Sequence, residues 1–386
     1  MTPLKNSEIA RKYSITKTTV ANYILDAQNL KNNLECIKID KKVQLIDSPK
    51  NTEELERLVT LGRKFRPTTS QKTGEVNLEF YQLFNQESQF EIFRDLEIEK
   101  QIDLKYYYYK EGAEMWSNAI ENGGSGITFD VANLIARSIS EISGFFKSQK
   151  FNLIDVGCGN GQPADILIKT GQVDEYIAYD ISSNLLEITQ KNIRTNFPNQ
   201  KIITEEFDFQ KDSISKKFTN QKNKSHNLFG FIGNTICNLA PHERSEILNA
   251  FSKTMDKNDM VLISYSLDTV KNRKNLSYVR SMLNYWLPQM IGIDTQKVVT
   301  EVNFNTQKNC KELGIVLDKS YLLDFYFKGN KQTIYLNQGD KINLWKHYLF
   351  TLENIVKELD NAKLKPKFIV SNDNNVLFGC QLSIED

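Results

Sequence analysis

The chain has 386 residues, of which 40% are apolar and 25% charged, a composition typical of soluble globular proteins with room for two or three domains. Its 49 basic and 48 acidic residues leave a net charge of +1, which excludes whole-chain attraction to nucleic acid, so any such surface must be local. Five scattered cysteines without C-x-x-C spacing argue against a disulfide framework or metal site, and the lack of a signal peptide or a long apolar run predicts a cytoplasmic protein without membrane contact.

Residues 6–28 are predicted to form two short helices joined by a tight turn. The apolar residues at helical spacing that would be buried are Ile9, Ala10, Ile15, Val20 and Ile24. This pattern resembles a helix-turn-helix, in which the N-terminal residues of the second helix reach the DNA major groove. A plain helical hairpin is the alternative. With Thr16 as the cap of the second helix, the candidate DNA-binding residues are Lys17, Thr18, Thr19 and Asn22.

A small wing is predicted to follow these helices in residues 34–58. Two short strands would turn at Asp40 and Lys41, and a helix capped by Ser48 or Asn51 would come next. Basic residues are frequent across the whole segment, which favours a face that contacts phosphates, although lysine-rich solvated faces are common.

A linker and a docking helix are predicted between the N-terminal module and the rest of the chain. Residues 66–77 are polar and contain proline and glycine, as linkers do. Residues 80–101 then carry apolar residues at helical spacing, which predicts the helix. The tyrosines at 106–109 are interpreted as core residues or as the lining of a substrate entrance.

The run at 151–169 predicts a buried strand, a glycine-rich turn and a helix. Three alternate glycines let the backbone turn sharply and approach a ligand closely. They are Gly157, Gly159 and Gly161. The G-x-G-x-G spacing differs from the G-x-G-x-x-G of dinucleotide sites, where a pyrophosphate rests on a helix N-terminus.

Two carboxylates strengthen the interpretation of this turn as a cofactor site. Asp155 lies two residues before the first glycine, where it suits a cationic or amino-bearing ligand better than a pyrophosphate. Asp180 ends the next predicted strand, where an acidic residue can accept hydrogen bonds from ribose hydroxyls. S-adenosylmethionine therefore fits this pattern and NAD fits poorly. The alternative is that both are solvated carboxylates at strand ends.

Polar side chains also follow the next two predicted strands. Asp208 ends the third strand, where a carboxylate can bind an adenine amine. Asn234 and Asn238 follow an apolar strand and precede a helix that begins at Pro241. In open α/β sheets ligands bind beyond the carboxyl ends of the strands, so these amides are candidate ligand contacts. An ordinary turn role is the alternative for each of the three.

The motifs IDVGCGNGQ, YDISSNLLEIT, FDFQ and FIGNTICNLAPHER, in this order, resemble class I S-adenosylmethionine-dependent methyltransferases. The last of them is similar to the G-S-T-I-G-N segment of the histidine-specific Nα-methyltransferase family. Three further stretches resemble that family, and the resemblance spans about residues 104–384. They are residues 104–120, 266–279 and 300–318.

The resemblance implies roles for several residues of this chain. Gly157, Asp180 and Asp208 would contact the cofactor, and Asn238 would hold the amino-acid end of a substrate. A tyrosine that binds the substrate carboxylate in the family has Tyr278 as its nearest candidate here, offset by about two positions.

The same resemblance fails at the position that recognises imidazole in the family. An acidic residue stands there in a strand near the C-terminus, whereas the corresponding strand here, at 331–340, has Gln332 or Thr333. Histidine is therefore disfavoured as the substrate. The chain's own histidines are interpreted as surface or packing residues, with His347 placed in a helical stretch. Trp286 and Trp345 are interpreted as core residues, with a box around a methylated cation as the alternative.

The predicted fold is α/β, with a Rossmann-like methyltransferase domain at 104–386, a linker and docking helix at 67–103, and a helix-turn-helix module at 1–66. The predicted function is methylation of the amine of a small amino-acid-like molecule by S-adenosyl-L-methionine. One alternative is a DNA-binding regulator that senses this cofactor or a metabolite without turnover. Another is a nucleic-acid methyltransferase, although the N-P-P-Y-type motif is absent. A homodimer is a hypothesis by analogy with helix-turn-helix proteins.

Overall fold

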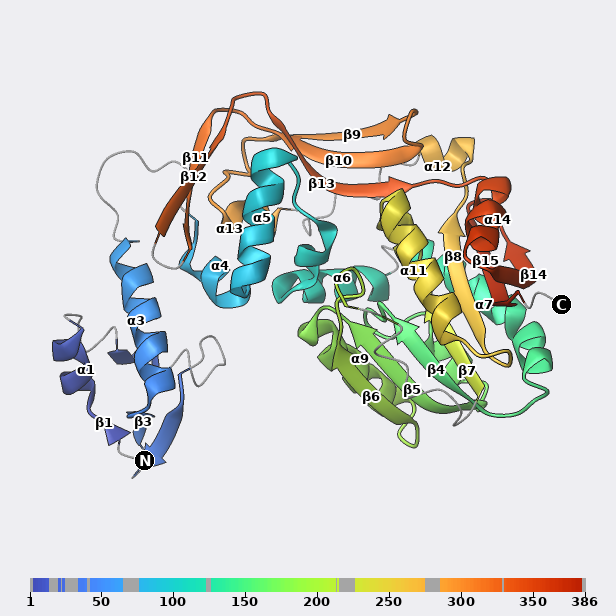
Figure 1. The fold of residues 1–386 in the computed structure, drawn as a ribbon, viewed down its shortest axis with the longest axis horizontal. Coiled ribbons are helices and arrows are strands. Elements are labelled where there is room, and N and C mark those ends of the chain that lie inside the picture. The colour runs from blue at the N-terminus through green and yellow to red at the C-terminus, as the bar shows by residue number, and fades with distance from the viewer. Residues whose placement is uncertain are drawn as a thin grey trace. The chain divides into compact units, whose positions relative to one another are not determined.

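The computed structural model describes residues 3–13, 20–21, 23–24, 34–39, 42–64, 76–122, 126–212, 214, 226–274, 285–327 and 330–383 (Figure 1). The chain divides into two compact units, each made of segments that are distant in the sequence. The larger unit contains Ile102–Trp286, Thr300–Ile315 and Ile342–Asp386. The smaller unit contains Met1–Gln101, Leu287–Val299 and Val316–Lys341.

A seven-stranded mixed sheet forms the centre of the larger unit (Figure 1). Five neighbouring strands run parallel, and a C-terminal antiparallel hairpin extends the sheet at one edge. In spatial order the strands are β6 (Lys201–Glu206), β5 (Val173–Asp180), β4 (Phe151–Val156), β7 (His226–Phe231), β8 (Met260–Ser266), β15 (Asn375–Leu382) and β14 (Leu364–Ser371). The predicted parallel strands around the glycine turn are therefore confirmed.

Both faces of this sheet are apolar, because successive residues of a strand point to opposite sides. Ile154 and Ile177 pack in one cluster with residues of α11 and α14, while Leu153 and Tyr176 pack in another with residues of α7, α8 and α9. Strands covered on both faces are nearly continuously hydrophobic, as β4 is. The helices are α7 (Gly126–Phe145), α8 (Asp165–Ile168), α9 (Ser183–Asn196), α11 (Pro241–Thr254) and α14 (Leu352–Asn361).

Short elements and a second sheet complete the larger unit. The sheet is three-stranded, in the order β13, β10, β9. One terminal residue of each strand, namely Lys341, Val316 and Val299, is assigned to the smaller unit. Phe350, just after β13, donates its backbone N–H to Ser266 at the end of β8. The elements are β9 (Val299–Asn305), β10 (Cys310–Val316), β13 (Lys341–Tyr348), α6 (Glu111–Glu121), α12 (Val270–Lys274), and the 3-10 helices η1 (Leu104–Tyr108) and η3 (Thr235–Asn238).

The smaller unit contains two helices where residues 80–101 predict one. Asn85 separates them, because its side chain accepts a hydrogen bond from Ser88 N and so caps a new helix. Phe93 then packs edge-on against Phe325 of a β-hairpin. The elements are α4 (Leu78–Leu83), α5 (Gln86–Ile98), β11 (Tyr321–Phe327), β12 (Asn330–Leu336), and α13 (Trp286–Met290) from its second residue on.

The N-terminal residues form a small core of their own. The predicted hairpin is present, with Ile39 opposite Lys42, and Ser48 caps the following helix by accepting from Asn51 N. Ile9 and Leu45 are among the residues buried there. The DNA-binding candidates Lys17, Thr18, Thr19 and Asn22 lie outside the described residues. The elements are β1 (Pro3–Leu4), α1 (Asn6–Lys12), β2 (Cys36–Ile39), β3 (Lys42–Ile46) and α3 (Pro49–Lys64).

The described residues exclude two kinds of feature. No helix there has both the length and the apolar character needed to cross a lipid bilayer. Within the same residues, no group of three or more His, Cys, Asp or Glu side chains could hold a metal ion.

Candidate functional site

The glycine turn leaves β4 in a conformation that few other residues adopt. Gly157 and Gly159 have φ of +75° and +59°, in the left-handed region. The N–H groups of Gly157 and Cys158 donate to the carbonyl of Tyr179 on β5, at 2.8 and 3.1 Å. A Cβ at Gly159 would come within 2.3 Å of the Trp116 ring. The turn therefore requires glycine both for its backbone and for the aromatic ring that covers it.

Asp180 at the end of β5 is tied to this turn. Its carboxylate accepts from Gly159 N and from Ser182 N, each at 3.0 Å. The residue is 6% exposed, and burial raises the pKa of its carboxyl to about 6, against these backbone hydrogen bonds, which lower it. Asp180 is thus fixed beside the glycine backbone.

Asp208 follows β6 and forms an ion pair inside the cavity. One carboxylate oxygen accepts from Lys105 Nζ of η1 at 3.1 Å, and the other accepts from Gln210 N at 3.0 Å. Both partners of the ion pair are mostly buried. Lys105 was not among the candidates from the sequence, because 103 residues separate it from Asp208.

A hydrogen-bonded group surrounds Asn238 at the end of η3. Its Oδ1 accepts from Trp345 Nε1 at 3.0 Å and lies 3.1 Å from His347 Nδ1. The other ring nitrogen of His347 lies 2.8 Å from Ser266 Oγ, which also bonds the Asn234 amide at 2.8 Å. Residues from η3, β8 and β13 thus meet in one network.

His347 is a neutral member of this network. It is 2% exposed, and burial, together with the nearby Lys311 ammonium, lowers its pKa to about 3. The imidazole therefore carries no charge at neutral pH. Its ring is tilted 34° from that of Trp345, with centroids 5.2 Å apart.

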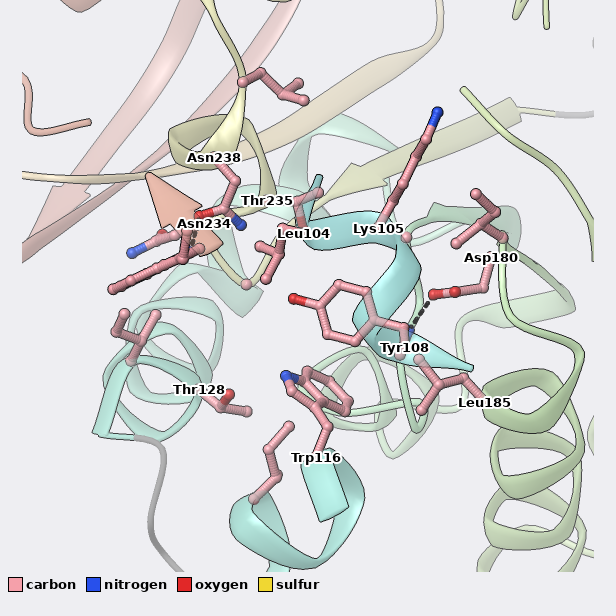
Figure 2. Close-up of a pocket in the computed structure, with 18 of the residues that line it drawn as sticks. Leu104, Lys105, Tyr108, Trp116, Thr128, Asp180, Leu185, Asn234, Thr235 and Asn238 are labelled. Carbon is pink, nitrogen blue, oxygen red and sulfur yellow. Dashed lines mark hydrogen bonds between the residues drawn. The ribbon is translucent and has the colours of Figure 1, made fainter. Parts of the chain in front are cut away.

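One cavity of about 480 Å³ connects these groups. Figure 2 shows its walls, with Asp180 and Leu185 on one side and Asn234 and Asn238 on the other. Its lining includes most of the candidate ligand residues from the sequence, which are Gly157, Gly159, Asp180, Asp208, Asn234 and Asn238. It also includes residues that sequence reasoning did not assign to a ligand site, which are Asp103, Lys105, Trp116, Thr128, Trp345 and His347 among others. Tyr108 lines the cavity as well, in agreement with one of the two interpretations of residues 106–109.

Two described candidates from the sequence, Asp155 and Gly161, are not in this lining. Asp155 is 1% exposed and accepts from the Tyr176 hydroxyl at 2.9 Å, and burial raises the pKa of its carboxyl to about 7. Asp155 is thus held inside the sheet, where its other oxygen has no hydrogen-bond partner among the described residues. Gly161 packs near Thr189 and is also away from the cavity. Tyr278 lies outside the described residues.

The acceptor end of the site differs from its sequence-based interpretation. His347 is on strand β13 rather than in a helix, and Trp345 lines the cavity rather than packing in the core. The interpretation of Trp286 as a core residue is correct, because it is 8% exposed. Thr333, one of the two counterparts expected at an imidazole-binding position, lies exposed on β12, donates to Asp324 and is not part of the cavity lining. The alternation in KINLWKHY, with Ile342 and Leu344 buried, is the signal that indicates a strand.

Known proteins resemble this chain in sequence and in fold. Histidine N-alpha-methyltransferase from Mycobacterium tuberculosis is 22% identical over 181 residues, or 46% of this chain and 54% of the relative, so the chain spans about half the length of that relative. An S-adenosylmethionine-dependent methyltransferase from Clostridium acetobutylicum is 14% identical, with 77% of this chain and 99% of that chain covered and a TM-score of 0.36. Magnesium protoporphyrin IX methyltransferase from Synechocystis, solved with bound SAH, is 11% identical, with 72% and 98% covered and a TM-score of 0.40.

The family itself is shown by a match over most of the chain. Residues 88–382 match the family described as histidine-specific methyltransferase, SAM-dependent. The mixed sheet, with its glycine turn after β4 and acidic residue after β5, is the Rossmann-like fold of such enzymes. The chain therefore belongs to the S-adenosylmethionine-dependent, histidine-specific methyltransferase family.

Proposed function

We propose that this protein transfers a methyl group from S-adenosylmethionine to the amine of a small amino-acid-like substrate. The observation that carries the proposal is the continuous cavity, because it contains both the glycine turn with Asp180 and the amide of Asn238. Its volume of about 480 Å³ is within the range of small-molecule sites. The curated relative named above is a methyltransferase of an amino acid, which supports the substrate class.

The donor set of the cavity fits the cofactor. Asp180 would accept hydrogen bonds from the ribose hydroxyls and Asp208 from the adenine amine, while the bare backbone of Gly157 and Gly159 would allow close approach. The cofactor supplies an electrophilic methyl group on a sulfonium. Lys105 would keep the Asp208 carboxylate in place through their ion pair.

The protein's own contribution is alignment. The acceptor nitrogen forms a bond to the methyl carbon as the carbon–sulfur bond breaks, the electron pair stays on sulfur, and the extra proton leaves to solvent. No cavity residue is needed as a base, and His347 is unsuited to that role because both of its ring nitrogens lie within hydrogen-bond distance of Asn238 and Ser266. Holding an unprotonated amine in line with the methyl group is therefore the main task of the site.

Calorimetric titration with S-adenosylmethionine tests the proposal, with product formation measured on a panel of amino acids. We expect the intact protein to bind the cofactor, Asp180→Ala to lose binding, and S-adenosylhomocysteine to accumulate with a suitable acceptor. Binding without turnover on any amine would favour a regulator that senses the cofactor. No binding by the intact protein would overturn the proposal.

We also infer that residues 1–66 form a winged helix-turn-helix that binds DNA. The β2–β3 hairpin, the Ser48 cap and the shared core around Ile9 and Leu45 support such a module. Fluorescence anisotropy of the full chain with a random-sequence duplex tests the inference. Binding should weaken steeply as salt is raised and should fall in Lys17→Glu. If adding the protein at low salt left the anisotropy of the duplex unchanged, the inference of DNA binding would be wrong.

A further inference from the structure

Trp345 fixes the orientation of the Asn238 amide. An indole N–H can only donate a hydrogen bond, so the Asn238 atom 3.0 Å from Trp345 Nε1 must be the oxygen. A rotated amide would place two donors against each other. The donor-only indole therefore fixes an amide orientation that is otherwise ambiguous for asparagine.

The same orientation determines the tautomer of His347. The Asn238 oxygen is an acceptor, so His347 Nδ1, which lies 3.1 Å away, carries the proton. His347 Nε2 then accepts from the Ser266 hydroxyl at 2.8 Å. Every polar atom of the Trp345 and His347 rings is therefore engaged within the protein, and these rings offer only apolar surface to a bound molecule.

Asn238 consequently presents its amide N–H groups to the cavity side. Its oxygen already accepts from Trp345 and His347, and its Nδ2 donates no hydrogen bond to the described residues. Two N–H donors suit a carboxylate, which only accepts. The amine of an amino acid, which donates, would not be held by this group.

The charged side chains of the described cavity lining are Asp103, Lys105, Asp180 and Asp208, and Lys105 is paired with Asp208. Asp180 and Asp208 belong to the cofactor side, and Asp103 caps η1 by accepting from Lys105 N. The other lining includes apolar Met115, Ile120 and Ile127 beside polar Tyr108 and Thr128.

We propose that the methyl acceptor is an α-amino acid with an uncharged, apolar side chain, whose carboxylate is bound by Asn238 Nδ2 and whose side chain lies against Trp345 and His347. The proposal rests on the proposed function and names its substrate class. An imidazole or ammonium side chain would lose its water against rings that offer no free donor or acceptor, and burial of an unpaired polar group is unfavourable. Trp345 and His347 are thus the specificity-determining pair.

Binding to the full chain loaded with S-adenosylhomocysteine tests the substrate class without requiring turnover. Calorimetry would compare L-phenylalanine, L-leucine, L-histidine and L-lysine. We expect phenylalanine or leucine to bind at least roughly tenfold more tightly than histidine or lysine. Equal or tighter binding of histidine or lysine, or no binding of any of the four, would overturn the proposal. Failure of the proposed function would appear separately, as apolar amino acids that bind but are never methylated.

A matched pair of variants tests the role of the Trp345 N–H. Trp345→Phe keeps a ring but removes the donor that orients Asn238, while Trp286→Phe removes an indole N–H that donates to Tyr107 O outside the cavity lining. We expect intact protein to bind L-phenylalanine several-fold more tightly than L-phenylalaninamide. Trp345→Phe should lose most of that preference and Trp286→Phe should retain it, with cofactor affinity unchanged in both. A preference that persists in Trp345→Phe would contradict the assigned orientation.

Discussion

The two ends of the cavity are built differently. At the cofactor end, backbone groups of the glycine turn and a carboxylate from the next strand lie within one stretch of about thirty residues, from β4 to Ser182. At the acceptor end, side chains from η3, β8, β13 and β15 meet from segments up to 141 residues apart. Backbone conformation determines which substitutions the cofactor end tolerates. Side-chain hydrogen bonding determines which substitutions the acceptor end tolerates. A substitution at one end should therefore change the binding of its own ligand and leave the binding of the other ligand unchanged.

The largest effect should come from Gly159→Ala. The new methyl group would lie 2.3 Å from the Trp116 ring at a φ of +59°, so the turn must shift. We expect cofactor binding to fall below detection and stability to drop by about 1–3 kcal/mol. Calorimetry and thermal unfolding would measure these changes.

A suitable control is Gly171→Ala, at a φ of +73° with no atom within 4 Å of the new Cβ. This variant adds the same kind of backbone strain without a clash of the new methyl group. It should therefore leave the affinity for the cofactor unchanged. If both variants bound the cofactor equally, crowding by Trp116 would not be what requires glycine at position 159.

The opposite end should respond to Asn238→Ala with nearly the reverse pattern. Loss of the donors that hold the acceptor should lower kcat/KM by about a hundredfold or more, as misplacement of a bound reactant does, while the dissociation constant for S-adenosylmethionine stays within twofold. Steady-state kinetics would measure kcat/KM, and calorimetry would measure the dissociation constant for S-adenosylmethionine. Asn249→Ala, which removes an amide that bonds Ser245 within α11, is the control and should change neither value. Parallel loss of cofactor affinity in Asn238→Ala would show that the two ends are not separable.

The sequence allows the cofactor end to be predicted far better than the acceptor end. Asp180 lies 21 residues from Gly159, inside one strand–turn–strand unit with a recognisable pattern, and its contact with that turn follows from the topology. Trp345 and His347 reach Asn238 from over a hundred residues away, through a second sheet whose packing no local pattern specifies. His347 was therefore interpreted as helical, and Trp345 as core. The roles of the predicted ligand residues stay predictions.

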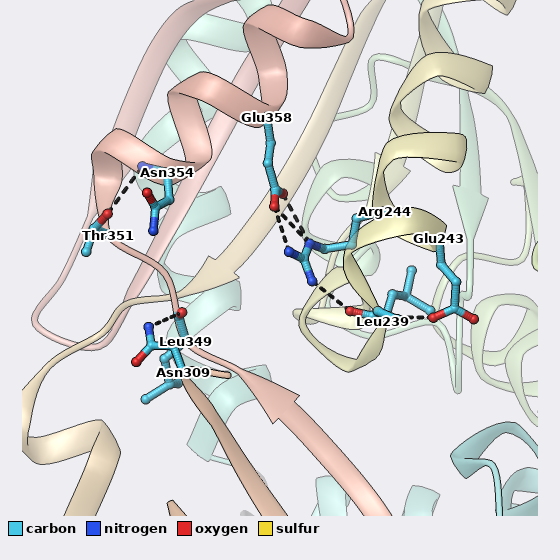
Figure 3. A network of polar contacts seen from close by, with 9 residues as sticks. Leu239, Glu243, Arg244, Asn309, Leu349, Thr351, Asn354 and Glu358 are labelled. Atoms are coloured by element: carbon cyan, nitrogen blue, oxygen red, sulfur yellow. Dashed lines mark hydrogen bonds and ion pairs between the residues drawn. The ribbon is translucent and has the colours of Figure 1, made fainter. Parts of the chain in front are cut away.

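A mostly buried ion pair joins α11 to α14 next to Leu239 (Figure 3). Arg244 of α11 donates to Glu358 of α14 at 2.7 Å and also to the carbonyl of Leu239, the residue after Asn238. Glu358→Gln should lower stability by about 2 kcal/mol, because it leaves a guanidinium that is 7% exposed without its counter-charge. The acceptor KM should also rise, with cofactor affinity unchanged.

Thermal unfolding and kinetics would test this effect, with Glu353→Gln, in the first turn of the same helix, as the control. A stability loss in Glu358→Gln without any change in KM would mean that the ion pair supports the fold but does not position Asn238.

The smallest effect should be a difference in pH response between the two ends. Burial raises the pKa of Asp180 to about 6, so its carboxylate becomes protonated as the pH falls through that value and can no longer accept from both ribose hydroxyls. Affinity for S-adenosylmethionine should therefore be about tenfold weaker at pH 5 than at pH 7.5. His347, with its pKa lowered to about 3, stays neutral over this range, so the affinity of the loaded protein for zwitterionic L-phenylalanine should hardly change. Calorimetry at both pH values measures the two responses, and Asp180→Asn should bind the cofactor weakly and without this pH dependence. An acid-side loss in phenylalanine affinity equal to that of the cofactor would place a titrating group at the acceptor end and contradict its neutral character.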